Sequence, residues 1–224
     1  MAGWRRTLEA ESHLLDRYSA LHSIANRVPR RVTWLATRRM EALNRFLSLG
    51  FPTTRDEDWR FTSVAPIADT HFVPGLPSPA VHVDPFRLPG LKGAELVFVN
   101  GEYVPALSHV GSLPPGVRVE SLAPVVAERT EELEPYLTRV ASFERHAFTA
   151  LNTALVGDGA HIRIPPHTAV NEPIHLLFMS TDSGGDLASM SHPRVVVVLG
   201  EQTQAAIVET YAGAGGLRFF KNGF

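Results

Sequence analysis

The sequence predicts an α+β protein, mainly β in its last third, in which a helical N-terminal region leads into a stack of short strands. Apolar residues recur at helical spacing up to Gly50. At residues 157–159 (Gly-Asp-Gly) the period changes to a two-residue alternation, which is typical of a strand. Short apolar segments separated by Pro, Gly, Asp and Ser then continue to the last residue.

The composition indicates a globular chain whose net charge does not attract it strongly to nucleic acid or to anionic lipid. Its 224 residues are 44% hydrophobic and carry a formal net charge of -2. The absence of cysteine excludes disulfides, thiolate nucleophiles and thiolate metal ligands supplied by this chain. Iron–sulfur or zinc–thiolate chemistry would therefore need a partner's sulfur. The first residues become charged before a signal peptide could form, so we expect a cytoplasmic protein without nucleic-acid or membrane partners.

Two amphipathic helices are predicted at the N-terminus. The first runs from Trp4 to about Ala25 and cannot continue through Pro29. The second covers an apolar stripe from Val32 to Leu47, and Gly50 is placed to act as a left-handed C-terminal cap. We expect the two helices to pair.

Residues 53–62 (TTRDEDWRFT) predict a polar loop. We expect Trp59 to anchor the loop to the preceding helix and an arginine, Arg55 or Arg60, to pair with a carboxylate. An active site built on the three acids at 56–58 is the alternative. Consecutive carboxylates do not face one another in a helix or a strand, so they make a poor acid/base pair.

The middle of the chain predicts a connector followed by mixed α and β structure. Five prolines between residues 73 and 90 favour extended backbone. Asn100-Gly101 between two apolar segments, 95–99 and 102–104, is a strong hairpin signal because both residues accept positive φ. The remaining elements expected here are a strand and two helical segments, at 117–119, 125–137 and 143–155.

The last third predicts successive turns of a flattened coil with uneven loops. The strands expected after residue 161 are Ile174–Met179, Arg194–Leu199, Ala205–Thr210 and Leu217–Phe220. Phe224 comes directly after a predicted strand, and solenoids normally close with a capping element. We therefore expect the chain to be part of a longer protein.

No motif in the sequence predicts an autonomous catalytic, metal or nucleotide site. His161, His167 and His175 could approach one another on stacked strands, but they match no metal-binding pattern, so hydrogen-bonded or solvent-facing histidines are favoured. Residues 182–186 (DSGGD) lack the spacing of a calcium loop. The glycines at 213–216 lack the Lys-Ser/Thr and the following helix of a phosphate-binding loop.

Several segments, in order along the chain, resemble the SufD family, a subunit of the SufB–SufC–SufD iron-sulfur cluster assembly machinery. The resemblance extends from Gly50 to Tyr211, and its ordered set of motifs is specific although each alone is weak. The matching segments are GFPTTRDEDWRFT (50–62), LVFVNG (96–101), LNTA (151–154), DGA (158–160), EPI (172–174), HPR (192–194), and Glu209 with Tyr211.

The resemblance implies a helical N-terminal region, residues 1–157, and the start of a flattened right-handed parallel β-helix, residues 158–224. It implies a non-catalytic scaffold for iron-sulfur cluster assembly that pairs with SufB and binds the ATPase SufC through a C-terminal helical segment. That segment and the family's cluster-handling histidine have no counterpart before Phe224. We therefore expect no cofactor or metal in this chain, the cluster being handled by the full complex, and no competence of the chain alone.

The residues that match the family are expected to be architectural. They are Glu57, Trp59, Arg60, Phe61, Thr62, Asn152, Asp158, Gly159, Pro193 and Arg194. Within this set, Asp158-Gly159 fits a tight turn into the first strand of the coil, with glycine supplying positive φ.

Two alternatives stay open at this point. The homologous SufB subunit shares the fold, although the 50–62 motif and the lack of cysteine favour SufD. A carbohydrate-active parallel β-helix enzyme is the alternative from another class. It predicts a groove of paired acids, whereas the candidate acids lie mostly in or beside predicted turns: Asp158, Glu172, Asp182, Asp186 and Glu201.

Overall fold

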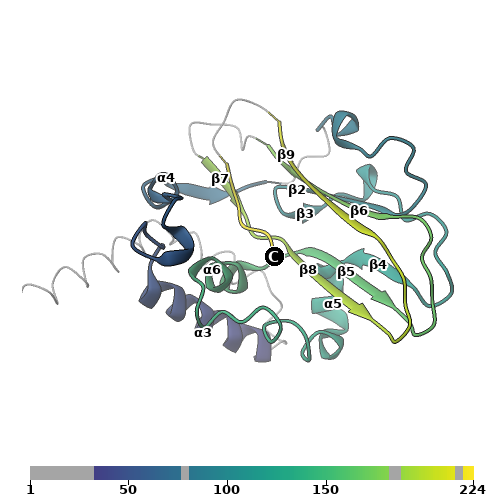
Figure 1. Cartoon of the computed structure of the whole chain (residues 1–224), viewed down its shortest axis with the longest axis horizontal. Helices are drawn as coiled ribbons and strands as arrows, with labels where there is room; N and C mark the ends of the chain where they lie inside the picture. Colours follow the sequence, from purple (N-terminus) through teal and green to yellow (C-terminus); the bar gives the residue numbers. More distant parts are fainter. Residues whose placement is uncertain (1–32, 77–80, 182–187, 215–218) are drawn as a thin grey trace, which may run out of the picture.

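The computed structural model describes residues 33–76, 81–181, 188–214 and 219–224, and it shows an α+β protein with parallel strands in three sheets (Figure 1). The helix expected between Trp4 and Ala25 lies outside the described residues. The described helices are α3 (Thr33–Leu49), α4 (Ala65–Ala68), α5 (Leu122–Glu128) and α6 (Ala147–Leu155). Short 3₁₀ turns connect the elements: η1 (Glu57–Trp59), η2 (Asp84–Phe86), η3 (Pro105–Leu107) and η4 (Thr130–Glu132).

Helix α3 and its cap confirm the second predicted helix. The helix ends where Gly50 takes a φ of 68°, and the Gly50 amide donates a 2.8 Å hydrogen bond to the Phe46 carbonyl. Leu43 and Phe46 on its buried face pack into one core cluster with Leu151 of α6. This pairing of α3 with α6 fixes the helical layer beneath the sheets (Figure 1).

Asn100-Gly101 forms the predicted hairpin between β2 (Glu95–Val99) and β3 (Glu102–Tyr103). Asn100 has a φ of 52° and Gly101 a φ of 87°, as the turn type requires. The Asn100 side chain donates to the Leu76 carbonyl at 2.7 Å and to the Thr181 hydroxyl at 2.9 Å. The turn therefore also joins β2 to the end of β6.

The sheets are formed by strands far apart in the sequence. The strands are β1 (Phe72–Pro74), β4 (Arg118–Ser121), β5 (Gly159–Ile164), β6 (Ile174–Ser180), β7 (Ala188–Ser191), β8 (Arg194–Leu199), β9 (Ile207–Gly213) and β10 (Phe219–Lys221), besides β2 and β3. The orders within the sheets are β1-β7-β10, β3-β2-β6-β9 and β4-β5-β8. All pairings are parallel except β2 with β3 and β4 with β5.

From β5 onward the chain visits the three sheets twice in the same order. The strands β5, β6 and β7 make one turn, and β8, β9 and β10 lie beside them in the second. The register pairs Gly159 with Arg194, Ile174 with Ile207, and Ser189 with Phe219. Each of β8, β9 and β10 thus pairs in parallel with its counterpart among β5, β6 and β7.

Some element predictions were wrong in their bounds. Helix α5 begins at Leu122 and ends at Glu128, short of the expected 125–137 segment, and η4 follows it. Strand β9 begins at Ile207 rather than near Ala205. The strand β7 was not predicted, because its sequence, Ala-Ser-Met-Ser, is largely polar although all four residues are buried.

The sheets enclose an apolar core and cross the predicted domain boundary between residues 157 and 158. Leu96, Phe98, Ile162, Ile174 and Phe178 form its centre, between the β6 sheet and the β5 sheet. Strands β1, β2 and β4 precede residue 157, yet they pair with β7, β6 and β5. The two predicted regions therefore share their sheets.

Candidate functional site

The Asp158 side chain organises the entry from α6 into the coil. Its Oδ1 accepts hydrogen bonds from the Ser121 hydroxyl at 2.7 Å, the Ala123 amide at 3.0 Å and the Gly159 amide at 2.7 Å. Its Oδ2 accepts from the Tyr103 amide at 2.9 Å. Because the buried carboxylate accepts hydrogen bonds from four donors, it acts as a structural acceptor.

Gly159 is required by the close approach of the next turn. Its φ is 148°, and a Cβ at this position would lie 1.9 Å from the Arg194 carbonyl oxygen. Gly159 therefore has the expected positive φ as the first residue of β5, and its lack of a side chain gives the backbone of β8 room to pair with β5.

Arg194 is buried beside α6, and its guanidinium joins the helix to the coil. Its Nε donates to Asn152 Oδ1 at 2.7 Å and its Nη2 donates to the Thr153 hydroxyl at 2.9 Å. Burial lowers the pKa of Arg194 to about 10, so it keeps its charge at neutral pH. The Phe224 ring lies over the guanidinium, 5.6 Å from its carbon to the ring centroid.

Asn152 completes this junction. Its Nδ2 donates to the Pro193 carbonyl at 2.9 Å and to the Asn222 carbonyl at 2.5 Å. The fold therefore joins three of the residues that match the family, Asn152, Pro193 and Arg194, by hydrogen bonds. It places Asp158 and Gly159 at the adjoining turn.

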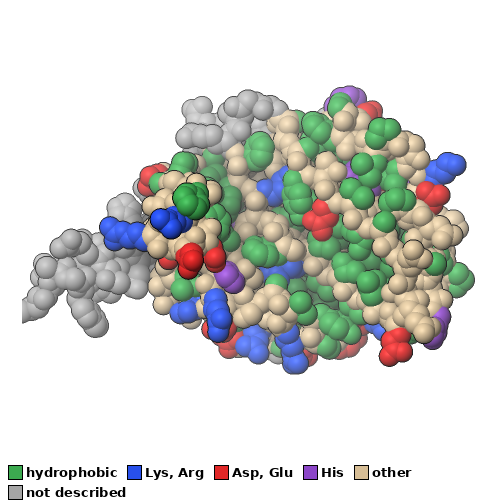
Figure 2. Space-filling model, in the orientation of Figure 1, with side chains coloured by type: hydrophobic (Ala, Val, Ile, Leu, Met, Phe, Trp, Pro, Cys, Tyr) green, Lys and Arg blue, Asp and Glu red, His purple; other side chains and the backbone are tan. Residues whose placement is uncertain are grey.

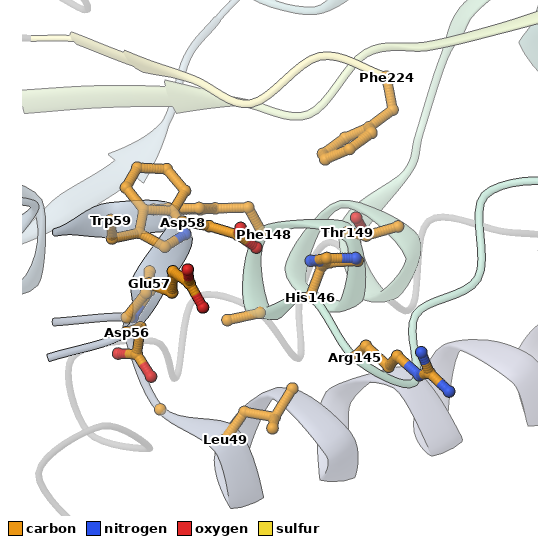
Figure 3. A pocket seen from close by; sticks show the side chains of 13 residues that line it. Leu49, Asp56, Glu57, Asp58, Trp59, Arg145, His146, Phe148, Thr149 and Phe224 are labelled. Carbon is orange, nitrogen blue, oxygen red and sulfur yellow. The ribbon is translucent and has the colours of Figure 1, made fainter. Parts of the chain in front are cut away.

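A cavity of about 730 Å³ lies between η1 and the start of α6 (Figure 3). Glu57 and Asp58 line one side of it and Arg145 and His146 another, as Figure 3 shows. The Trp59 ring packs on Phe148 of α6, with ring centroids 5.0 Å apart, whereas the sequence favoured an anchor on α3. The lining brings charges of both signs beside aromatic rings, and it places no hydroxyl nucleophile in hydrogen-bond contact with a base.

The rest of the 53–62 loop faces outward. Phe61 is 92% exposed, Thr62 is exposed, and the Arg60 guanidinium lies over the Phe61 ring at 5.4 Å. Asp56 caps the loop, because its Oδ2 accepts from the Thr53 amide at 2.7 Å. Trp59 therefore has a contact with another element, α6, whereas the exposed Phe61 contacts its sequence neighbour Arg60.

The three histidines considered as metal ligands have separate partners. His161 contacts Glu120 at 3.1 Å, and His167 contacts Gln202 at 2.7 Å. His175 contacts Glu95 at 2.8 Å and Thr210 at 2.9 Å. In the described part of the chain, no group of three or more His, Asp or Glu side chains could hold a metal ion.

Comparison with known proteins identifies the family. The sequence matches the family model described as "SufBD protein N-terminal region" over residues 9–176, which is most of the chain. This chain belongs to the SufBD family. The predicted resemblance is confirmed at the level of the family.

Curated relatives of this SufBD chain carry iron-sulfur cluster assembly in their names. An iron-sulfur cluster assembly SufBD family protein of Synechocystis is 32% identical over 179 residues, 79% of this chain and 39% of the relative. The iron-sulfur cluster assembly protein SufD of Escherichia coli is 25% identical over 80% of this chain and 39% of the relative. SufD of Bacillus subtilis is 26% identical over 80% of the chain and 41% of the relative. The chain thus spans about two fifths of the length of these relatives.

The second turn of the SufBD chain leaves one edge of each sheet without a partner strand among the described residues. The edge strands are β8, β9 and β10. Ile164 of β5 is 1% exposed, whereas Leu199, its register partner on β8, is 52% exposed. Figure 2, in the orientation of Figure 1, shows hydrophobic side chains on the face that carries β8 and β9. An apolar position that is buried in the first turn is therefore apolar again in the second turn, where it is exposed.

Sequence reasoning missed the partners of His175. Neither Glu95 nor Thr210 stood out in the sequence, because the two residues are far apart along the chain and match no motif.

Within the described residues, no helix is long and apolar enough to span a membrane.

Proposed function

We propose that this chain is the N-terminal region of a SufD-type scaffold subunit for iron-sulfur cluster assembly. The family match over residues 9–176 carries the proposal, and relatives named for SufD and for cluster assembly support it. We further propose that it takes part in cluster assembly without catalysing a step of that assembly, in the cytoplasm, with SufB and the ATPase SufC as partners of the longer protein.

The repeated visit to three sheets supports a flattened right-handed parallel β-helix as the architecture of the longer protein. The register of β8, β9 and β10 sets the positions at which a further turn would pair. Such a turn would cover the exposed apolar side chains of the second turn and bind its free backbone groups.

The cluster itself is the cargo in this proposal. Since the chain has no cysteine, the thiolates that hold iron and sulfide would come from SufB. The part of the chain up to residue 224 would position the coil, through the Asp158 and Arg194 contacts, and would not hold the cluster.

Co-expression of the tagged chain with the SufB and SufC homologues of its source organism tests the proposal. We expect the longer protein, tagged in the same way, to retain SufB. The 224-residue chain should retain SufC only weakly, because the SufC-binding segment lies in the part of the relatives that this chain does not span. Failure of the longer protein to retain SufB would contradict the scaffold assignment, and tight retention of SufC by the 224-residue chain would contradict the placement of the SufC-binding segment. Turnover of an acidic polysaccharide with added calcium would instead support the carbohydrate-active alternative.

A further inference from the structure

A chain of buried polar side chains on the outer face of the β6 sheet ends at a hydroxyl group. Glu95 and His175 are register partners on β2 and β6, and Thr210 lies on the same face of β9. Glu95 Oε2 lies 2.8 Å from His175 Nδ1, and His175 Nε2 lies 2.9 Å from Thr210 Oγ1. Glu95 and His175 are buried, whereas Thr210 is half-buried at the edge strand.

The ion pair of Glu95 fixes the direction of the hydrogen bonds. Arg87 contacts Glu95 Oε1 and also contacts Asp84 at 3.2 Å, so Glu95 is held as a carboxylate, which can only accept. His175 Nδ1 must then carry a proton and donate it to Glu95. In the neutral imidazole, Nε2 is left as the acceptor, and the Thr210 hydroxyl donates to it.

Burial keeps the imidazole in its neutral form. It lowers the pKa of His175, and the positive charge of Arg87 lowers it further, while Arg87 also offsets the charge of Glu95. At neutral pH the His175 ring is therefore a free base next to a hydroxyl. A hydroxyl bonded to a histidine that a carboxylate orients is the arrangement that activates nucleophiles in acyl transfer.

We propose that Thr210 is an acyl-accepting nucleophile, with His175 as its general base and Glu95 as the residue that positions the imidazole. The substrate class is a small activated acyl ester, because Thr210 is half-buried, which limits the size of the acyl group that can reach its hydroxyl. This activity is independent of the proposed scaffold role.

The reaction is an acyl exchange without oxidation or reduction. Thr210 Oγ1 attacks the carbonyl carbon of the ester, and its proton passes to His175 Nε2. The bond from the carbonyl carbon to the leaving oxygen then breaks, and that oxygen takes the proton from His175. The products are an acyl ester of Thr210 and a free alcohol.

Acetylation of the whole chain by p-nitrophenyl acetate tests the proposal. We expect one acetyl group on Thr210, formed about 100-fold faster than on Thr203, a half-buried threonine whose hydroxyl donates only to the Gly200 carbonyl at 3.0 Å. Peptide mass spectrometry locates the label, and hydroxylamine removes the ester on Thr210 but not amides on Lys92 or Lys221.

Substitutions show whether Thr210 reacts because His175 activates its hydroxyl or only because the hydroxyl is exposed to the reagent. Thr210→Ser should keep the label, Thr210→Val should lose it, and Thr203→Val should leave it unchanged. His175→Asn and Glu95→Gln should slow labelling of Thr210 and change its pH profile. Absence of label on Thr210 in the folded wild-type chain, or labelling that is equally fast in a folded His175→Asn variant, would overturn the proposal. If the buried variants do not fold, the comparison of Thr210 with Thr203 decides it.

Discussion

At the residue scale, Gly157 and Gly159 differ in whether the fold leaves room for a side chain. A Cβ at Gly159 would lie 1.9 Å from the Arg194 carbonyl oxygen, and φ is 148°, whereas Gly157 is exposed with nothing within 4 Å of its Cβ position. We expect Gly159→Ala to reduce the free energy of unfolding by several kcal/mol, about 3 or more. Gly157→Ala, the matched control, should change it by less than about 1 kcal/mol. Urea unfolding measures both, and equal effects of the two substitutions would contradict the steric explanation.

His192 gives a second prediction at this scale, on the dependence of stability on pH. The ring is buried, its Nδ1 lies 3.3 Å from Asn222 Nδ2, and burial lowers the pKa of His192 to about 3. In the unfolded chain its pKa returns to about 6.5, so the unfolded state binds the proton more readily. Stability contributed by the neutral ring is therefore complete above about pH 6.5 and is lost as the pH falls toward 3.

The His192→Leu variant isolates this contribution. Between pH 6 and pH 5 the free energy of unfolding of the wild type should fall more steeply than that of the variant, by about 1 kcal/mol per pH unit. Urea unfolding at each pH measures the slopes. His161 and His175, whose pKa values burial also lowers, contribute equally to both proteins. Identical slopes would show that His192 is not neutral in the folded state.

The sequence predicted the conformation at Gly159 but not the contacts of the residues around it. A Gly-Asp-Gly break between two periodicities indicates a turn from local information alone. Arg194 stood in a matching segment, yet its partners Asn152 and Thr153 lie about forty residues earlier in the chain. Burial of an arginine depends on such distant partners, so no local pattern could indicate it.

At the scale of elements, the stacked rings of Phe98, Phe178 and Tyr211 tie three strands together. The ring centroids are 4.9 Å apart between Phe98 and Phe178 and 5.0 Å apart between Phe178 and Tyr211, with nearly parallel planes. The register pairs the same residues on β2, β6 and β9. We expect Phe178→Ala to reduce the free energy of unfolding by about 3–5 kcal/mol, because it empties the centre of the stack.

Phe61→Ala is the control for this prediction, since Phe61 is 92% exposed. Its effect should stay within about 0.5 kcal/mol. Thermal or urea unfolding of both variants provides the measurement. A loss at Phe178 no larger than that at Phe61 would mean that the ring stack contributes little to holding β6 between its neighbours.

The elements that could be predicted are those whose signal is local. The hairpin followed from Asn100-Gly101, and the end of α3 followed from Gly50. Strand β7 could not be found, because Ser189 and Ser191 are buried by β1 and β10 on either side rather than by an apolar pattern of their own. For the same reason Trp59 was assigned to the nearest helix in sequence and not to α6.

At the scale of the whole molecule, repetition along the chain was predictable, but the sheet that each strand joins was not. Irregular spacing of the strands predicted a coil with uneven loops, and the structure pairs β8, β9 and β10 with β5, β6 and β7 in three separate sheets. The antiparallel strand β4 and the early strands β1 and β2 complete the sheets from the N-terminal side. Their pairing depends on contacts over long sequence separations, which periodicity does not encode.

The uncovered second turn leads to a prediction about self-association. Val197 and Leu199 repeat the inward positions of Ile162 and Ile164, yet both are exposed on strand β8, beside backbone groups that have no partner among the described residues. An apolar strand edge of this kind pairs with other chains. We expect the 224-residue chain to associate reversibly as its concentration rises, and the double substitution Val197→Lys/Leu199→Lys to shift it toward the monomer.

Sedimentation velocity over a range of concentrations measures this association. Val140→Lys is the matched control, because Val140 is 85% exposed and lies outside the three sheets, so it should leave the sedimentation profile unchanged. Equal association of the two lysine variants would assign the contact to another surface. A wild type that stays monomeric at high concentration would contradict the prediction that the exposed edge of β8 pairs with other chains.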